Sequence, residues 1–494
     1  MHDTRAWARQ WLQTPRNLYI DGGWRSASDA RTLATVDPAD QSTLTTYGVA
    51  NEVDVEAAAA AARRASRAGD WPRMARRDRG KLLQRIAAVI RDHADELATL
   101  ESLDNGKLLR ESVEDDLPES ADVFDYYAGW VDKHYGETCP VGHGFINYTV
   151  HEPVGACGLI VPWNFPLLMA CWKLAMALAC GNTVVIKPSE HTPLSLSRLF
   201  ELLDERVALP PGVVNLVLGD GETGAAIARS PRLDKVAFTG STRTGRAVLA
   251  GAAASNLKRV SLELGGKSPN ILFADLPDRD AAVARVYAAL FSHKGEKCSE
   301  PTRLLVQRPL YDNVVAELAA MAEAAVCGHP FAPTSQQGPQ CHRAHFESVM
   351  RYVELGRAEG RLVAGGVADT RGENANGLFV RPTIFADVDN SARVAQEEIF
   401  GPVLVITPFE DEDEAVRLAN ETSYGLAAGL YTADVSRAHR VASRLDAGMV
   451  FVNRYGCYDF ASPFGGFKQS GHGKELGRHS LAEFTRTKSI WIAL

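Results

Sequence analysis

Short apolar runs alternate with helix-like stretches through the middle of the chain. The apolar runs, each a predicted strand, are residues 158–161, 183–187, 213–217, 235–239 and 259–264. Between them, apolar residues recur at helical spacing over 167–179, 193–207, a short stretch after Glu222, and 245–253. Strands that alternate with helices predict a parallel sheet that is covered by helices on both faces.

A second series of the same kind follows. It contains predicted helices over 280–291, 311–326 and 412–420 and predicted strands at 303–306 and 403–406. Residues 126–150 and 484–492 read as extended segments outside either series, and neither could bury both of its faces alone. The pattern therefore predicts two doubly wound α/β units with two extended segments beside them.

The N-terminal region is predicted to be helical. Residues 53–67 are rich in alanine and have Asn51 as an N-cap, and residues 79–103 carry apolar side chains at helical spacing. The first residues lack the apolar core of a secretory signal, although Arg5 and Arg9 leave a transit peptide as an alternative. We therefore expect a cytoplasmic protein.

An uncharged run over residues 154–172 is long enough, at 19 residues, to suggest a membrane span. Pro162, Asn164 and Pro166 interrupt this run, and Lys173 ends it. It is therefore predicted to form a buried strand, an irregular turn and a buried helix, without membrane contact.

Composition gives the size class and argues against some partners. The chain has 494 residues, of which 46% are apolar and 23% charged, and this length suits about three domain-sized units of roughly 150 residues each. The net charge is 53 − 61 = −8. This mild acidity argues against nucleic-acid binding, and a basic cluster at residues 73–81 is predicted to be the solvated face of a helix.

The eight cysteines form no CxxC pair, so neither a disulfide framework nor a zinc ribbon is predicted. Cys341, His342 and His345 lie close together as metal ligands often do, but no second pair stands at ligand spacing. We therefore expect an exposed helix with polar side chains here, and no metal site.

Two glycine-rich turns could bind a phosphate. Gly219, Gly221 and Gly224 form a GxGxxG motif between a predicted strand and a predicted helix, as in a dinucleotide-binding turn. The stretch from Gly240 to Gly245 (GSTRTG) also follows a strand and opens a helix whose N–H groups could hold an anion. The residues alone leave both sites open, as well as a purely structural role for the first turn.

Two reactive side chains are candidates for chemistry. Glu263 ends a predicted strand, and ligands of α/β sheets lie at the carboxyl ends of strands, so Glu263 is a candidate general base. Cys298 lies among charged residues (GEKCSEPTR), unlike Cys157, Cys171 and Cys180, whose neighbours are apolar. A nucleophilic thiol needs partial exposure and positive surroundings, but by spacing alone a structural loop cysteine is the favoured interpretation and a nucleophile is the alternative.

A series of motifs resembles those of the aldehyde dehydrogenase superfamily, in the family's order and near its spacing. They are PWNFP (162–166), KPSE (187–190), FTGST (238–242), ELGGKSP (263–269), GEKC (295–298), EEIFGPV (397–403) and PFGGFKQSGHGKELG (463–477). The resemblance extends from about Tyr19 to the C-terminus. It implies an α/β fold with two doubly wound, Rossmann-like domains and a small β oligomerisation flap. The implied parts are an NAD-binding domain (1–125 and 149–263), a catalytic domain (264–478) and oligomerisation segments (126–148 and 479–494) of a homodimer or homotetramer.

The resemblance also implies catalytic roles. Cys298 would attack the aldehyde carbonyl to give a thiohemiacetal, with the Asn164 amide and the backbone N–H of Cys298 as the oxyanion hole. Hydride transfer would leave a thioester, which Glu263 would hydrolyse by activating a water molecule. Lys173 and Glu475 match positions that serve Glu263.

NAD is the implied cofactor, with NADP possible. Lys187 and Glu190 match positions that hold the adenosine ribose, and Ser241 matches a contact to the pyrophosphate. Gly219 to Gly224 would then pack around the adenine side. The implied cofactor-binding residues are Trp163, Lys187, Glu190, Gly221, Gly240, Ser241, Gly245, Leu264, Glu398 and Phe400, with Glu398 on the nicotinamide ribose and Phe400 beside the ring.

The implied substrate tunnel is apolar. Its matching residues are Phe165, Met169, Trp172, Tyr458 and Phe464. Aromatic rings and a thioether favour an aromatic or medium-chain aliphatic aldehyde and offer no fixed cation for an anionic tail. Arg454 and Lys297 lie close in sequence to this wall.

The chain departs from the family pattern next to the nucleophile. Glu296 stands where the family usually has Gln, and Glu300-Pro301-Thr302 where it has small residues. An inward carboxylate would raise the pKa of the Cys298 thiol, whereas Lys297 would lower it. Two alternatives remain. One is a CoA-acylating relative, against which Glu263 argues, and the other is a non-catalytic binding or structural relative, which would have little reason to keep the set of catalytic residues together.

Overall fold

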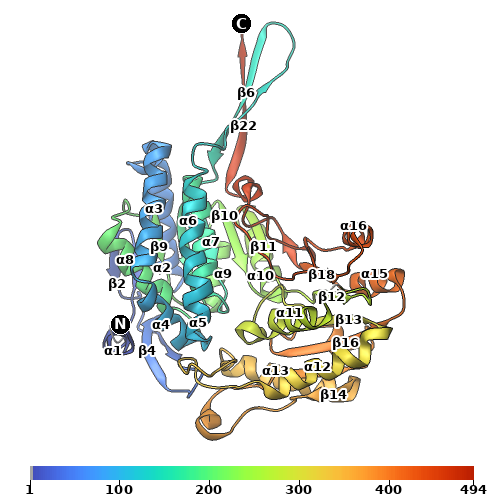
Figure 1. The fold of residues 1–494 in the computed structure, drawn as a ribbon. Helices are drawn as coiled ribbons and strands as arrows, with labels where there is room; N and C mark the ends of the chain where they lie inside the picture. The colour runs from blue at the N-terminus through green and yellow to red at the C-terminus, as the bar shows by residue number, and fades with distance from the viewer. Residues whose placement is uncertain (1–3, 277) are drawn as a thin grey trace.

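The first predicted α/β unit forms a mainly parallel sheet in the computed structural model, which describes residues 4–276 and 278–494 (Figure 1). In spatial order its strands are β2 (Gly23–Arg25), β1 (Leu18–Ile20), β9 (Val214–Leu216), β8 (Thr183–Lys187), β7 (Ala156–Ile160), β10 (Lys235–Thr239), β11 (Arg259–Glu263) and β21 (Gly471–His472). Five neighbouring strands, β9, β8, β7, β10 and β11, are parallel. Strands β8 and β9 lie on one side of β7, and β10 and β11 lie on the other. Ligands of such a sheet bind at the carboxyl ends, where the strand order reverses.

The second predicted unit forms a separate sheet. Its strands, in spatial order, are β14 (Arg361–Ala364), β15 (Thr383–Ala386), β16 (Val403–Phe409), β13 (Arg303–Gln307), β12 (Pro269–Leu272), β18 (Ala427–Tyr431) and β19 (Met449–Val452). All neighbouring pairs in it are parallel except β14 with β15. The two doubly wound sheets predicted from the sequence are therefore confirmed.

The helices cover both sheets. The α-helices are α1 (Thr4–Trp11), α2 (Glu52–Arg67), α3 (Arg76–Asp92), α4 (Ala94–Asn105), α5 (Leu109–Glu111), α6 (Leu117–Ala128), α7 (Pro166–Ala179), α8 (Leu194–Arg206), α9 (Gly221–Arg229), α10 (Thr242–Ala253), α11 (Arg279–Phe291), α12 (Tyr311–Ala324), α13 (Arg343–Glu359), α14 (Arg393–Gln396), α15 (Glu412–Asn420) and α16 (Val435–Arg444). Asn51 caps α2 as predicted, because its side chain accepts from the N–H groups of Val53 and Asp54.

Helix α7 occupies the uncharged run that ends at Lys173, and it is buried along its whole length. The run begins with β7 and continues through an irregular turn, as the sequence predicted. Across residues 4–276 and 278–494, no helix is both long and apolar enough to span a membrane.

The helical stretch predicted over 79–103 contains two helices, α3 and α4, because the backbone of His93 is not helical. The apolar periodicity continues across the break, since both helices pack on the same core. Two other local predictions are wrong. Tyr126 is not extended but helical, because the last turn of α6 buries Tyr127, which hydrogen-bonds with Ser480 (2.7 Å).

The segment with Cys341, His342 and His345 is not an exposed helix. Cys341 and His345 are buried, and His342 is the N-cap of α13. The backbone N–H of Cys341 donates to Glu296 (3.0 Å), which draws this segment into the interior. In the described part of the chain, no group of three or more His, Cys, Asp or Glu side chains is placed to hold a metal ion.

An antiparallel ribbon extends away from the rest of the molecule (Figure 1). It contains β6 (Phe145–Pro153) and β22 (Thr485–Ala493), which pair along their full lengths, and β5 (Thr138–Cys139) beside β6. The C-terminus lies at its tip, and Phe145, Trp491 and Ile492 are exposed there. The remaining strands form two small pairs, β3 (Thr32–Val36) with β4 (Thr43–Gly48) and β17 (Tyr424–Gly425) with β20 (Phe467–Lys468).

Candidate active site

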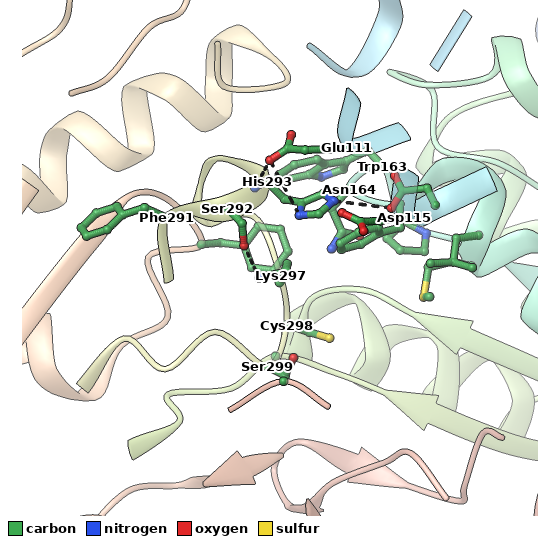
Figure 2. Close-up of a pocket in the computed structure, with 18 of the residues that line it drawn as sticks. Glu111, Asp115, Trp163, Asn164, Phe291, Ser292, His293, Lys297, Cys298 and Ser299 are labelled. Carbon is green, nitrogen blue, oxygen red and sulfur yellow. Dashed lines mark hydrogen bonds and ion pairs between the residues drawn. The ribbon is translucent and has the colours of Figure 1, made fainter. Parts of the chain in front are cut away.

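A cavity of about 1020 Å³ connects the two sheets. The first sheet contributes the residues that follow β7, β10 and β11, including Asn164, Ser241 and Glu263. The second unit contributes Cys298 and Glu398. The cavity thus lies at the carboxyl ends of the first sheet, as expected for this topology. Figure 2 shows Cys298 on its wall, with Asn164 and Lys297 nearby.

Cys298 follows α11 and is half-buried on the cavity wall. Burial raises the pKa of its thiol well above the ordinary value, and the carboxylates of Glu263, Glu398 and Glu475 raise it further. The thiol therefore lies among carboxylates rather than in positive surroundings. These surroundings favour the neutral form of the thiol until a base or a ligand shifts its protonation equilibrium.

The side chains next to Cys298 in sequence turn away from it. Glu296 is buried, and one of its oxygens lies 2.8 Å from Lys294 Nζ. Lys297 donates to the Ala289 carbonyl (2.9 Å) and to Ser292 (2.7 Å), and it lies 3.3 Å from Glu300. Both charges are thus occupied by other partners, which answers the question that the sequence left open.

Three charged side chains lie close together in the interior: Glu263, Lys173 and Glu475. Lys173 Nζ forms an ion pair with Glu475 and donates to Thr239 Oγ1 (2.7 Å). Glu263 is 4% exposed, and its Oε1 has no hydrogen-bond partner. Burial raises the pKa of Glu263 well above the ordinary value, and Glu475 raises it further. The carboxyl therefore keeps its proton to higher pH and can act as a base only when it is ionised.

Asn164 is held in place by backbone contacts. Its Nδ2 donates one hydrogen to the carbonyl of Glu296 (2.7 Å), which leaves the second hydrogen for another acceptor. Asn105 donates to the carbonyl of Trp163 (2.7 Å), and Glu101 accepts from the N–H of Leu167 (3.1 Å). These contacts fix the turn that carries Asn164 at the end of β7.

Lys187 connects the GxGxxG turn to the carboxyl end of β8. Its Nζ donates to the carbonyls of Gly219 and Pro188 (both 2.7 Å) and lies 3.7 Å from Glu190 Oε2. Burial lowers the pKa of this amine. A Cβ on Gly224 would lie 3.5 Å from Lys187 Cε, so the turn packs closely on the lysine stem.

The second glycine turn, by contrast, opens on the cavity. Gly240 and Ser241 line it, and Ser241 caps α10 by accepting from the N–H of Thr244 (3.2 Å). Of the ten expected cofactor residues, six line the cavity: Trp163, Gly240, Ser241, Leu264, Glu398 and Phe400. The other four, Lys187, Glu190, Gly221 and Gly245, lie off its wall.

The side chain of Glu398 is held on the cavity wall by a hydrogen bond from the backbone of Gly266. Its Oε1 accepts from the N–H of Gly266 (3.1 Å), and burial raises the pKa of this carboxyl to about 7. A Cβ on Gly265 would fall 1.9 Å from Glu398 Oε2, so only glycine admits the carboxylate there. The ring of Phe400 lies edge-on to Trp163, with centroids 5.2 Å apart.

All five expected tunnel residues line the same cavity: Phe165, Met169, Trp172, Tyr458 and Phe464. The ring of Phe464 lies 5.3 Å from Trp172 and 5.7 Å from Tyr458. The hydroxyl of Tyr458 hydrogen-bonds with Ser299, the residue after Cys298 (2.6 Å). The aromatic wall is therefore next to Cys298.

Charged side chains also line the cavity. The basic ones are Arg110, Lys297 and His293, and the acidic ones include Glu111, Asp115, Asp116 and Glu119, whereas Arg454 does not line it. These acids were not among the site residues predicted from the sequence. The four-residue spacing of Glu111, Asp115 and Glu119 was a usable signal, because side chains so spaced share a helix face.

The chain is similar to known aldehyde-oxidising enzymes over nearly its whole length. The model of the "Aldehyde dehydrogenase family" matches residues 24–490. The chain is 44% identical to the NADP/NAD-dependent aldehyde dehydrogenase PuuC of Escherichia coli over 98% of this chain and 97% of that protein. It is also 44% identical to the human mitochondrial aldehyde dehydrogenase, over 96% of this chain and 91% of that protein. The NAD⁺ complex of an aldehyde dehydrogenase from Bacillus cereus superimposes with a TM-score of 0.95 at 42% identity, covering 98% of each chain.

The carboxylates around the thiol give a first testable prediction. We expect Glu263→Gln to accelerate alkylation of Cys298 by iodoacetamide between pH 8 and 10, because removing this charge lowers the pKa of the thiol. The expected gain is roughly threefold to tenfold at a fixed pH, measured by mass spectrometry of the peptide that contains Cys298.

Glu205→Gln is the control, since it removes a carboxylate from an exposed position in α8 that is not on the cavity wall. This variant is expected to react at the rate of the unaltered protein. Faster alkylation in Glu205→Gln than in Glu263→Gln would contradict the arrangement described above.

Proposed function

The chain belongs to the aldehyde dehydrogenase family, and from this membership we propose that it oxidises an aldehyde to the carboxylic acid with NAD, through a thioester on Cys298. The observation that carries the proposal is the presence of Cys298, Asn164 and Glu263 on one cavity. A nucleophile, an oxyanion donor and a base in one site are the groups that this chemistry requires.

The donors and acceptors around the cavity suit a dinucleotide. Lys187 and Glu190 offer an ammonium donor and a carboxylate acceptor for ribose hydroxyls, and Glu398 is a second buried acceptor. The N-terminus of α10, with Ser241, favours an anion such as the pyrophosphate. Gly265, whose Cβ would meet Glu398, leaves room for that acceptor. Bound NAD supplies the hydride acceptor, and NADP is the alternative cofactor.

Cys298 acts first in the proposed reaction. Its thiolate attacks the aldehyde carbonyl and forms a thiohemiacetal, whose oxygen accepts the free N–H of Asn164 and the backbone N–H of Cys298. The Glu296 carbonyl orients the Asn164 amide for this role. Loss of hydride from the thiohemiacetal carbon then leaves a thioester on Cys298.

Glu263 completes the proposed reaction. Its unpartnered Oε1 removes a proton from water, the resulting hydroxide attacks the thioester carbonyl, and the acid and the Cys298 thiolate are released. The ion pair between Lys173 and Glu475 holds both of these charged side chains in place beside Glu263. The presence of this base favours hydrolysis over transfer of the acyl group to the thiol of CoA, which is the alternative reaction.

The aldehyde is proposed to carry an apolar segment next to its carbonyl, either aromatic or medium-chain aliphatic. The support is the wall of Phe165, Met169, Trp172, Tyr458 and Phe464 beside Cys298. Burial of apolar surface against such a wall contributes about 25 cal/mol per Å².

The chain is also proposed to assemble as a homodimer or homotetramer through the ribbon of β6 and β22. Its outer strand edges and the exposed Phe145, Trp491 and Ile492 would be covered by a second copy. The proposed domains keep the boundaries given above, although residues 1–3 of the first and residue 277 of the second lie outside the described residues. We propose a cytoplasmic location.

Replacement of the nucleophile tests the proposal most simply. We expect Cys298→Ala to lose aldehyde oxidation, because the covalent step cannot occur, while NAD still binds with an unchanged dissociation constant. NADH absorbance and calorimetric titration measure the two properties. Cys457→Ala, which alters an exposed cysteine away from the cavity wall, is the control and keeps both. Substantial turnover by Cys298→Ala would disprove the proposed nucleophile.

Replacement of the base separates the two halves of the reaction. Glu263→Gln is expected to release a burst of about one NADH per active site and then to stall, because the thioester forms but is not hydrolysed. Stopped-flow absorbance at fixed pH measures the burst, and added CoA tests transfer to a thiol. Steady turnover near the unaltered rate would show that another group is the base.

The position of Glu190 favours NAD over NADP. A carboxylate beside the ribose accepts a hydrogen bond from the 2′-hydroxyl but repels a 2′-phosphate. We expect Glu190→Gln to raise the ratio of kcat/KM for NADP over NAD by about tenfold. Glu205→Gln, an exposed acid in α8, leaves the ratio unchanged. Equal use of both cofactors by the unaltered chain would contradict this role.

A further inference from the structure

Three carboxylates on the cavity wall play no part in the proposed reaction. Glu111, Asp115 and Glu119 follow one another at four-residue intervals, in α5, in the π-helical turn Ser112–Asp116 and in α6. They line the same cavity as Cys298, and Figure 2 labels Glu111 and Asp115 on its wall. A substrate with its carbonyl at Cys298 would therefore contact these carboxylates with the part of the molecule that extends away from the thiol.

Two of these carboxylates are unpaired. Glu111 accepts from the backbone N–H groups of His293 (2.8 Å) and Leu108 (3.1 Å), so it is occupied. Across residues 4–276 and 278–494, no hydrogen bond or ion pair holds the side chain of Asp115 or Glu119. The neighbouring Asp116 is paired with the buried Lys107 and adds a further negative charge.

The basic side chains on the wall form no ion pair with Asp115 or Glu119. Lys297 is held by the Ala289 carbonyl, Ser292 and Glu300, His293 lies 3.4 Å from Asp116, and Arg110 is exposed. Burial, together with the like charges of Asp116, Asp115 and Asp122, raises the pKa of Glu119 to about 7. A positive charge placed beside Glu119 would relieve this repulsion.

The acidic wall belongs to the same cavity as the thiol. Cys298, Tyr458, Asp115 and Glu119 all line this cavity, and the Tyr458 hydroxyl hydrogen-bonds with Ser299, next to Cys298 (2.6 Å). A substrate whose carbonyl lies at Cys298 therefore shares the cavity with the two unpaired carboxylates.

We propose that the aldehyde oxidised by this chain carries a positive charge, as an amine or a quaternary ammonium group, at the end remote from its carbonyl. The inference rests on the proposed function and specifies its substrate. The apolar middle of such a molecule lies along the aromatic wall, and its cation lies beside Asp115 and Glu119. A cation passing the rings of Tyr458 and Trp172 is also attracted by their π faces.

Two aldehydes of the same shape test the charge alone. In 4-(trimethylammonio)butanal the remote end is a permanent cation that cannot cyclise onto the carbonyl, and 5,5-dimethylhexanal replaces its nitrogen with carbon. We expect kcat/KM for the cation to exceed that for the neutral aldehyde by at least about tenfold, which corresponds to about 1.4 kcal/mol. NADH absorbance at low ionic strength measures both values, and the preference falls as salt is added.

Variants of the two unpaired acids assign the preference to them. In the double variant Asp115→Asn, Glu119→Gln, the ratio of the two kcat/KM values is expected to fall by about tenfold. Each single variant is expected to lower the ratio by about threefold, which provides a result if the double variant does not fold. Glu114→Gln is the matched control, because it removes the same charge from the same π-helical turn but away from the cavity wall, and it keeps the ratio.

Each outcome is decisive. Oxidation of the neutral aldehyde without a preference for the cation would overturn this inference and leave the proposed function standing. An equal ratio in the unaltered chain and in all variants of Asp115 and Glu119 would also overturn it. No oxidation of either aldehyde, with NAD bound, would overturn the proposed function and this inference with it.

Discussion

Three lysines that are removed from water hold the walls of the cavity. Lys107 is paired with Glu101 and Asp116, Lys173 with Glu475, and Lys294 with Glu296. Removing one partner of a buried ion pair leaves an uncompensated charge and costs about 3–5 kcal/mol. The three lysines therefore fix the parts of the chain that meet at the cavity. Glu101 holds the start of α7, Glu475 lies beside Glu263, and the backbone carbonyl of Glu296 accepts a hydrogen bond from Asn164.

The same burial explains the electrostatics of the reactive groups. Cys298, Glu263 and Glu398 have raised pKa values chiefly because they are removed from water, and each carboxylate also acts on the thiol. A site in this state does not hold a permanently ionised nucleophile. The proposed attack on the aldehyde therefore requires that the thiol first loses its proton.

Much of the fold could be predicted from the sequence, because its parallel strands are buried on both faces and form apolar runs without alternation. The prediction for 183–187 coincides with β8, and that for 412–420 coincides with α15. Breaks inside a continuous apolar pattern could not be predicted, as at His93, and neither could the burial of Cys341, which depends on Glu296 from a distant segment. In the candidate site, the motifs identified residues that the structure brings onto one cavity. The direction of the Glu296 and Lys297 side chains depends on tertiary packing, which spacing along the chain does not determine. The four-residue spacing of Glu111, Asp115 and Glu119 indicates a shared helix face, but only the fold shows that this face lines the cavity.

The central claim is that Cys298 carries the acyl group during turnover, and rapid acid quenching followed by peptide mass spectrometry tests it most directly. The chain is mixed with NAD and an aldehyde, quenched within the first turnover, and digested at low pH so that a thioester survives. The peptide that contains Cys298 is expected to gain the mass of the acyl group in place of the thiol hydrogen, and Glu263→Gln is expected to increase its yield. An acyl group on another residue, or turnover with Cys298 unmodified throughout, would contradict the claim.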